Sequence, residues 1–518
     1  MMEFPLTAEK VSCARCAHNI DVTREETAEV AVPDACPDIA EILCVHAAAF
    51  VRSKETDTGR GAVSGVIKVE LVYAPPDGGR AVSLDAEIPF TAQTADGALT
   101  RDMRVTALAR AVACSARAGN PRKALINAAV RVRASFYTDC ELRLYHGAED
   151  GGGDESRVEL LYETAEICPP VDVRERTFVI SDELTLPQEY PPIGEVLFAD
   201  VELCVTDAKA VGSKLVFKGV AYIALLCISD GGGLVRAPLN TEFSQIVEFD
   251  ALAPESEFDV SLMLTGAYAE LRSQETGGRG VSVEIHAAAQ CVGFERRTVK
   301  YIADAFAPGL ELECEYTEFD AGGLAPARAA ECAAHVSLNL PDAVDVVAVI
   351  PGVFTPEASL SDGQARVRCG VEVTCLYADS EGRVHSARTS ADAECAPFEA
   401  PGAHSIEASR ARAGEASVSV SGGVVDLTIP LTFEITCPPA SRRRAITAIT
   451  CDSAALPDAP ELPSLTVTRI KPHEKLWSLA KRYGSGVRLI MEANGVAKES
   501  DVESGTLLLI PRRRPARR

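Results

Sequence analysis

The 518-residue sequence has little of several features that would point directly to a function. Aromatic residues make up 5% of it, and it has one tryptophan and 8 histidines. No apolar stretch approaches the ~18 residues that a membrane-spanning helix needs. The first ten residues lack a basic segment followed by an apolar one, so no secretion signal is recognisable. We therefore expect a cytoplasmic protein without a transmembrane segment.

Motifs of common catalytic sites are absent as well. The sequence contains no Gly-x-Ser-x-Gly, no His-Glu-x-x-His, no phosphate loop and no acidic calcium loop. His473-Glu474 has no second histidine four residues later, and no histidine shares a short segment with both a nucleophile and a carboxylate. We predict a protein without catalytic residues or cofactors, and an enzyme assembled from distant residues is the alternative.

The 17 cysteines have no framework spacing, and their number is odd. This pattern fits reduced thiols that act as small buried apolar residues in a reducing compartment. Cys13-x-x-Cys16, with His18 nearby, resembles the start of a zinc site. A structural zinc site needs a second pair of ligands at fixed spacing, and only Cys36 and Cys44 lie near in sequence. We predict no bound metal.

The charge of the chain is strongly acidic, with a formal net charge of -24 and a pI near 4.9. Such a charge disfavours binding to nucleic acid or to anionic membranes by the body of the protein. Residues 442–444 and the tail 512–518 are basic exceptions that suit an acidic partner. We prefer to interpret them as solvated ends of domains.

The last fifty residues carry the most specific pattern. Residues 465–470 form a short β-prone run. The spacing of one buried helical face then recurs at Leu476, Leu479, Ala480 and Tyr483. Residues 487–494 give a second short helix, and the apolar run 507–510 predicts a strand that pairs back on the first. This β-α-α-β order resembles a LysM module, in which Trp477 is predicted to be a core residue.

The resemblance to LysM modules also implies where a ligand would bind. In modules that hold N-acetylglucosamine polymers, the turn before the first helix commonly reads Gly-Asp-Thr-Leu, and its backbone helps to line a shallow groove. The matching positions here are His473, Glu474, Lys475 and Leu476. A bulky residue replaces the glycine, and the second groove loop reads Asn494-Gly495 where Asn-Pro is usual. These six residues form the predicted binding edge, and we prefer a protein partner over peptidoglycan or chitin.

The rest of the chain repeats itself. The segment 32–43 is echoed at 186–197 and more faintly at 340–350, with equal spacing. Downstream of each copy, a glycine followed by valine opens a run of alternating apolar residues, at Gly65, Gly219 and Gly370. Turn clusters and further β-prone runs follow, as is typical of hairpins. We predict a mainly β protein with three tandem antiparallel β domains, each a sandwich or an open barrel.

Shifts in composition give the expected boundaries. The three glycines at the strand starts are expected to be needed either for a positive φ or for close packing. The predicted units are an N-terminal segment 1–29, β domains 30–146, 157–308 and 330–440, a linker 441–463, a LysM module 464–511 and a basic tail 512–518.

The repeat itself resembles a known domain. Residues 37–43 read Pro-x-Ile-x-Glu-Ile-Leu, and Arg122-Lys123 precede a late strand. Both marks are similar to the SPOCS domain of spore-coat-associated proteins in endospore-forming clostridia. Three such domains followed by one LysM module is the layout of the SipL-type family of spore coat morphogenetic proteins.

This family resemblance implies a role and a partner. It implies a non-enzymatic adaptor in the mother-cell cytoplasm that joins the coat scaffold ATPase, stage IV sporulation protein A, to the forespore surface. The alternative is a cell-wall protein that binds peptidoglycan or chitin-type glycans, although such a protein would normally carry a secretion signal. A hydrolase accessory protein fits the architecture but not the absence of catalytic motifs.

Overall fold

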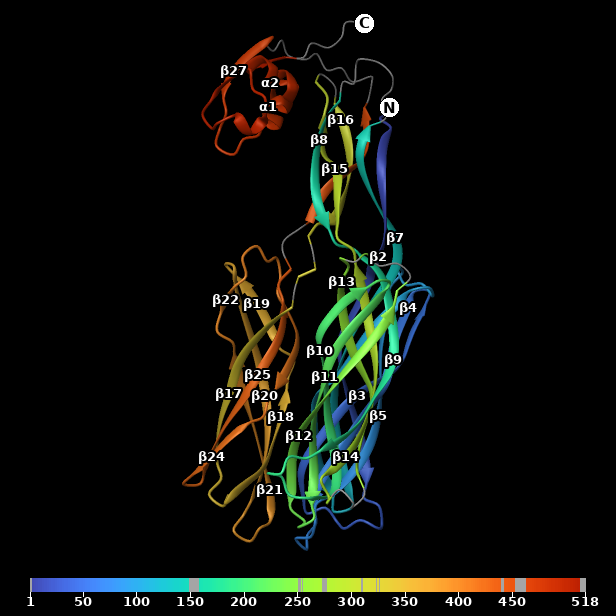
Figure 1. The fold of residues 1–518 in the computed structure, drawn as a ribbon, viewed down its shortest axis with the longest axis vertical. Helices are drawn as coiled ribbons and strands as arrows, with labels where there is room; N and C mark the ends of the chain where they lie inside the picture. The colour runs from blue at the N-terminus through green and yellow to red at the C-terminus, as the bar shows by residue number, and fades with distance from the viewer. Residues whose placement is uncertain are drawn as a thin grey trace.

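The computed structural model describes residues 2–148, 158–249, 253, 255–272, 277–308, 311–322, 324–325, 327–438, 442–451 and 463–512. A large β body, a narrow β neck and a small α/β head follow one another along the long axis (Figure 1). The body and the neck contain strands, and the helices of the described residues lie in the head. None of these helices has the length and apolar character needed to cross a membrane.

The first repeat supplies two antiparallel sheets, with strand orders β3-β4-β5 and β2-β7-β6. Successive hairpins join β3 to β4 and β4 to β5. In the other sheet, β2 pairs with the edge of β7 that lies opposite to β6. The strands are β2 (Leu6–Ala31), β3 (Glu41–Asp57), β4 (Arg60–Ala74), β5 (Val82–Ala95), β6 (Arg104–Asn120) and β7 (Lys123–Ala148).

The second and third repeats follow the same strand order. The second has sheets β10-β11-β12 and β13-β14-β9, built from β9 (Pro170–Thr185), β10 (Ile193–Val211), β11 (Lys214–Ser229), β12 (Leu234–Glu248), β13 (Glu257–Leu271) and β14 (Gly280–Phe294). The third has β17 (Arg328–Asn339), β18 (Asp345–Val353), β19 (Glu357–Ser361), β20 (Gln364–Ala378), β21 (Val384–Glu394), β22 (Phe398–Glu399), β23 (Glu407–Ala413), β24 (Ser417–Ser421) and β25 (Val424–Thr436). Here β20 and β25 are the central strands of the two sheets.

Each repeat is a sandwich, because the apolar faces of its two sheets pack on each other. In the first repeat, Ile67 and Val69 of β4 alternate with polar residues and are buried against Val130 and Phe136 of β7. This is the period-two pattern that the sequence shows. The structure confirms a mainly β fold of antiparallel sheets.

The three repeated glycines lie in the central strands where other atoms come close. A Cβ atom on Gly65 would lie 2.1 Å from the carbonyl oxygen of Phe50 and 2.7 Å from the ring of Phe90. Gly219 and Gly370 are covered by an aromatic ring in the same way. None of the three has a positive φ. Close packing is therefore the reason for glycine at these positions.

The neck consists of three antiparallel ribbons, one from each repeat. Residues 6–13 of β2 pair with 140–148 of β7, and the other ribbons are β8 (Glu159–Ile167) with β15 (Arg297–Phe306) and β16 (Leu312–Asp320) with β26 (Arg442–Cys451). β1 (Met2–Glu3) also pairs with β26. Leu144, Tyr301 and Phe319, one from each ribbon, meet in a shared apolar core. The neck thus ties the three repeats together.

Two segments differ from the expected division of the chain. Residues 1–29, which we placed outside the first domain, include most of β2, whose buried Val11 and Ile20 pack in the neck and in the first sandwich. Residues 442–451, which we placed in a linker, form β26. The three arginines at its start gave no alternating apolar pattern, so the sequence did not predict this strand. In the structure, Arg444 stacks 3.7 Å from the centroid of the Tyr316 ring on the paired strand. The remainder of that linker, 452–462, and tail residues 513–518 lie outside the described residues.

Candidate functional site

The head has the β-α-α-β order that the sequence predicts. Its elements are β27 (Leu465–Arg469), α1 (Leu476–Tyr483), α2 (Val487–Asn494), a short 3-10 helix (Glu499–Asp501) and β28 (Leu507–Pro511), with β27 antiparallel to β28. The core is formed by Ile470, Leu476, Leu479, Ala480, Ile490, Leu508 and Ile510. The predicted helical face is therefore confirmed. Trp477 is 7% exposed, which confirms that it is buried.

Trp477 is buried partly by the neck rather than by the head alone. Its indole Nε1 donates a 2.8 Å hydrogen bond to Asp304 Oδ2 on β15, and its ring meets Phe306 edge to face at 4.9 Å. Lys481 Nζ lies 2.8 Å from both carboxylate oxygens of Asp304. A bulge in the pairing of β15 with β8 lies between Ile302 and Asp304. Helix α1 thus docks the head on the ribbon from the second repeat.

The turn before α1 keeps the backbone shape that glycine would favour. His473 has a φ of 62°, in the left-handed region that non-glycine residues rarely adopt. Glu474 closes the turn, because it accepts a 3.0 Å hydrogen bond from the backbone N–H of Lys471 and pairs with Arg482 at 2.8 Å. Both contacts lower the pKa of Glu474, the hydrogen bond from Lys471 more than the pairing with Arg482. Its carboxylate is therefore committed within the head.

The next two residues of the predicted edge are also engaged. Lys475 Nζ lies 3.9 Å from Glu163 Oε1 of the neck. Leu476 is a core residue, and its backbone N–H donates a 2.8 Å hydrogen bond to Glu499 Oε1. Of the four turn residues, His473 is the one whose side chain faces solvent without a hydrogen bond or ion pair among the described residues.

The second predicted loop is held just as firmly. The Asn494 amide donates to the carbonyl oxygens of Ile490 and Leu509, both at 2.7 Å, and accepts from the backbone N–H of Leu509 at 2.8 Å. Gly495 ends α2 in the left-handed conformation, with φ 63°. Asn494 therefore joins α2 to β28, and its hydrogen-bonding capacity is used inside the head.

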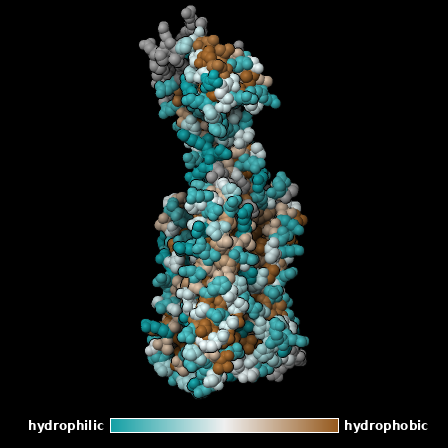
Figure 2. Space-filling model, turned by 90° about the vertical axis from the view of Figure 1, so that its left-hand side faces the viewer, coloured by the Kyte–Doolittle hydropathy of each residue, from teal (hydrophilic) through white to brown (hydrophobic). Residues whose placement is uncertain are grey.

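An exposed apolar face lies on the outer side of the β27–β28 pair, which we call the outer sheet face. It consists of Leu465, Val467, Leu507 and Leu509, which are 50%, 58%, 60% and 40% exposed. Val467 and Leu509 are direct cross-strand partners. In the hydropathy view, a hydrophobic patch marks the head (Figure 2). Sequence reasoning missed this face, although the apolar run 507–510 signals it, since a strand buries only every second side chain.

The cysteines considered for zinc are arranged differently from a metal site. Cys13 and Cys16 lie three positions apart on β2, and therefore on opposite sides of the strand. Cys13 Sγ lies 3.3 Å from Cys140 Sγ across the ribbon, while Cys16 Sγ lies 3.1 Å from Asn19 Oδ1. Within the part of the chain that the structure describes, no group of three or more His, Cys, Asp or Glu side chains has the geometry of a metal site.

Comparison with known proteins identifies the head. Residues 468–511 match the LysM domain family. No curated protein and no solved structure was found to match the chain. The head is therefore a LysM domain, and peptidoglycan or a related glycan is a candidate ligand for it. The resemblance of the three sandwiches to SPOCS domains stays a prediction.

Proposed function

We propose that this protein is a non-enzymatic adaptor in endospore coat assembly. It acts in the mother-cell cytoplasm at the forespore surface, and its LysM domain docks the coat scaffold ATPase, stage IV sporulation protein A. Support comes from the order of three SPOCS-like repeats and one LysM module, together with the outer sheet face. The three sandwiches serve as a rigid scaffold that presents the head at the end of the neck.

The outer sheet face is the observation that carries the proposal. Four aliphatic side chains stand together in solvent on two adjacent strands. Contiguous exposed apolar side chains rimmed by polar residues are typical of protein-interaction sites. Burying a leucine or valine fully contributes roughly 1.5–3 kcal/mol, so four half-exposed side chains supply roughly 3–6 kcal/mol of binding energy. We assign the ATPase contact to this face.

The glycan-binding alternative is favoured by the LysM match itself. Against it, Glu474 and Asn494 already bond within the head, and Lys475 faces the neck. The glycine that a close backbone approach would need is replaced by His473. These observations favour a LysM fold that has been reused for binding a protein.

The test compares two ligands and two kinds of variant. The purified full chain is assayed against the coat ATPase and against peptidoglycan and chitin. Val467→Lys and Leu507→Lys place a charge on the outer sheet face and should weaken ATPase binding at least tenfold. Val418→Lys is the matched control, because Val418 is an exposed valine on β24, far along the chain in the third repeat. It should leave binding unchanged.

Two results would refute the proposal. One is ATPase binding that is the same in Val467→Lys, Leu507→Lys and the unaltered chain. The other is tight binding to peptidoglycan or chitin by a chain that ignores the ATPase, which would establish the glycan alternative. In that case His473→Gly should strengthen glycan binding, because it restores the open backbone of the groove.

A further inference from the structure

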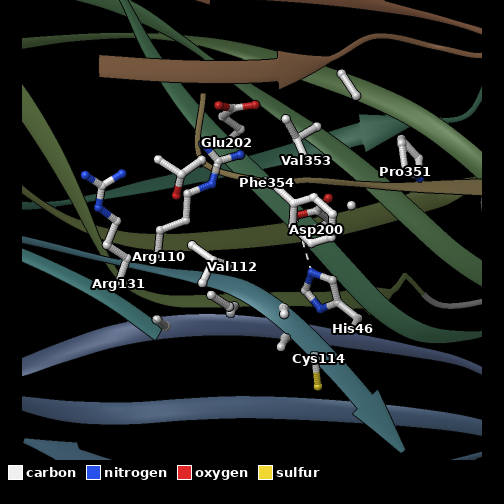
Figure 3. A pocket seen from close by; sticks show the side chains of 18 of the residues that line it. His46, Arg110, Val112, Cys114, Arg131, Asp200, Glu202, Pro351, Val353 and Phe354 are labelled. Carbon is white, nitrogen blue, oxygen red and sulfur yellow. Dashed lines mark ion pairs between the residues drawn. The ribbon is translucent and has the colours of Figure 1, made fainter. Parts of the chain in front are cut away.

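The three repeats enclose a cavity of about 380 Å³, which we call the inter-repeat cavity. Its wall includes residues of β3, β6 and β7 from the first repeat, of β10, β12 and β13 from the second, and of β20, β21 and β23 from the third. The volume falls within the usual range for sites that hold small molecules. Figure 3 shows its lining, with side chains from all three repeats directed toward a common space.

The wall of the inter-repeat cavity is basic, in a protein whose net charge is -24. Its cationic side chains are His46, Arg110, Arg131, Arg133, Arg236, Arg388 and Arg410. Its acidic side chains are Asp200, Glu202 and Glu372. The cations therefore exceed the carboxylates of the wall by a wide margin, which is the reverse of the whole chain.

Two of the arginines have close carboxylate partners outside the cavity. Arg131 forms two 2.6 Å hydrogen bonds with Asp21, and Arg133 lies 3.0 Å from Glu407. Their charges are balanced by these contacts. Arg131 and Arg133 therefore form part of the wall, and the excess positive charge of the cavity comes from the remaining arginines.

The other four arginines have spare hydrogen-bonding capacity. Arg110 donates to the carbonyl oxygen of Ala411 at 3.0 Å. Arg410 donates to that of Leu203 at 2.9 Å, and its Nε lies 4.0 Å from Glu434 Oε2, a longer contact than those of Arg131 and Arg133. Arg236 and Arg388 make no hydrogen bond to any described residue. Because a guanidinium group has five N–H donors, most of this capacity is unused. Burial lowers the pKa of Arg236 despite the opposing charge of Asp200, so its charge is held there at a cost.

The acidic groups do not neutralise this excess. Asp200 lies 3.3 Å from His46, and 56% of its side chain faces open space. The imidazole of His46 lies between Asp200 and Glu70, with Glu70 at 2.8 Å. The charge of Asp200 therefore already faces a cationic partner. Burial raises the pKa of Glu202, with the charges of Arg110 and Arg410 opposing that rise. In Figure 3 the Arg110 side chain extends toward Glu202.

Part of the wall is apolar. Pro351 and Val353 come from the end of β18, Phe354 from the segment that joins β18 to β19, and Met263 from β13. A basic wall beside an apolar one suits a small organic molecule with a negatively charged end. Planar guanidinium groups match carboxylate and phosphate oxygens in pairs.

We propose that the inter-repeat cavity binds a small organic anion through carboxylate or phosphate groups, with Arg236 and Arg388 as the principal ligands and Arg110 and Arg410 in support. The bound anion joins the three repeats, because these arginines come from all of them: Arg110 from the first, Arg236 from the second, Arg388 and Arg410 from the third. This proposal is independent of the assignment of the LysM domain.

Titration calorimetry of the full chain tests the proposal, with pyrophosphate as the phosphate probe and citrate as the carboxylate probe. Saturable binding of one molar equivalent of at least one probe is expected, and the stronger probe indicates the class of the natural ligand. Arg236→Gln and Arg388→Gln should each weaken binding at least tenfold. Arg366→Gln is the matched control, because Arg366 is an exposed arginine of β20 that pairs with Glu394. It should bind as the unaltered chain does.

A second measurement separates loss of binding from loss of folding. The better probe should raise the melting temperature of the unaltered chain and of Arg366→Gln, and should not raise that of Arg236→Gln. If a glutamine variant fails to fold, Arg388→Lys replaces it, since lysine keeps the charge but loses the paired donors. A several-fold weakening is expected for that variant. Absence of saturable binding of both probes, or equal weakening by Arg366→Gln, would overturn the proposal.

Discussion

The indole Nε1 of Trp477 lies 2.8 Å from Asp304 Oδ2, so a residue of the LysM core donates a hydrogen bond to a strand of the second repeat. Phe306 completes the contact from the same strand. The head is therefore seated on the neck rather than only tethered by the chain before it. As the one tryptophan of the protein, Trp477 reports on the folding of the head and on its docking.

Asp304→Ala should separate these two properties. It removes the acceptor of the indole and the partner of Lys481, and the loss of a hydrogen bond to a charged group costs about 1.5–3 kcal/mol. We expect the fluorescence of Trp477 to shift to the red while the helical signal of the head persists. Asp320→Ala is the control, because Asp320 is an exposed neck residue that lies 3.6 Å from Arg442. Unchanged emission in Asp304→Ala would show that the head core alone buries the indole.

The sequence predicted those elements of the fold whose pattern is contained in a short stretch of neighbouring residues. The helical stripe of α1 and the alternating strands of the sandwiches show in short windows, so their types were predictable from periodicity. The neck was not, because its core joins Leu144, Tyr301 and Phe319 across three repeats, and no local pattern records such a meeting. Asp304 was missed for the same reason, since nothing in its segment signals a partner in the LysM domain.

The candidate binding edge was only partly predictable. The resemblance to LysM modules located the turn and the second loop correctly within the head. It did not show that the Asn494 side chain forms hydrogen bonds with Leu509 of β28, because these depend on the distance between α2 and that strand. The inter-repeat cavity could not be predicted from the sequence either, because its arginines are spread along the chain from β6 to β23.

Gly65→Val should strongly destabilise the first repeat. The added side chain would meet the Phe50 carbonyl and the Phe90 ring, and overpacking of this kind costs more than about 3 kcal/mol when backbone has to move. Gly97→Val is the matched control, because a Cβ atom there meets nothing within 4 Å. Chemical denaturation followed by circular dichroism measures both. Equal midpoints for the two variants would contradict the close-packing argument.

The same variant tests how the parts of the protein are coupled. The linker that the sequence predicts at 441–463 would leave the LysM domain folded in this variant. Residues 442–451 of that linker are β26, and β7 runs from the first sandwich into the neck. We therefore expect Gly65→Val to disturb the docking contact of Trp477 as well as the first repeat. A native Trp477 emission after the first repeat has unfolded would show that the neck persists without it.

Asn494→Ala should destabilise the LysM domain rather than only its binding. It removes two hydrogen bonds that join α2 to β28 and a third within α2, and each hydrogen bond of this kind contributes about 0.5–1.5 kcal/mol. Arg488→Ala, on the exposed face of the same helix, should cost less than about 0.5 kcal/mol. Thermal melting followed through Trp477 compares them. A stable Asn494→Ala variant with altered ligand binding would instead assign Asn494 to the binding edge.

His46 should make the stability of the body depend on pH between about 6.5 and 9. Burial alone would lower the pKa of His46, but the hydrogen bonds and charges of Asp200 and Glu70 outweigh it and raise the pKa to about 9. Lys68 also contacts Glu70, at 2.7 Å. A histidine whose pKa is higher in the folded state than in the unfolded state binds its proton more tightly when folded. Its contribution is therefore complete below pH 6.5 and is lost as the pH rises toward 9.

The free energy of unfolding should accordingly fall across this window, by at most about 1.4 kcal/mol per pH unit for one proton. His46→Gln should be less stable than the unaltered chain at pH 6 and should lose this part of the pH dependence, because glutamine cannot carry the charge. His335→Gln is the control, since the exposed His335 contacts only the Thr428 hydroxyl among the described residues. Denaturant titrations at pH 6, 7.5 and 9 measure the effect. If His46→Gln keeps the slope of the unaltered chain, His46 is not the group that links the cavity wall to pH.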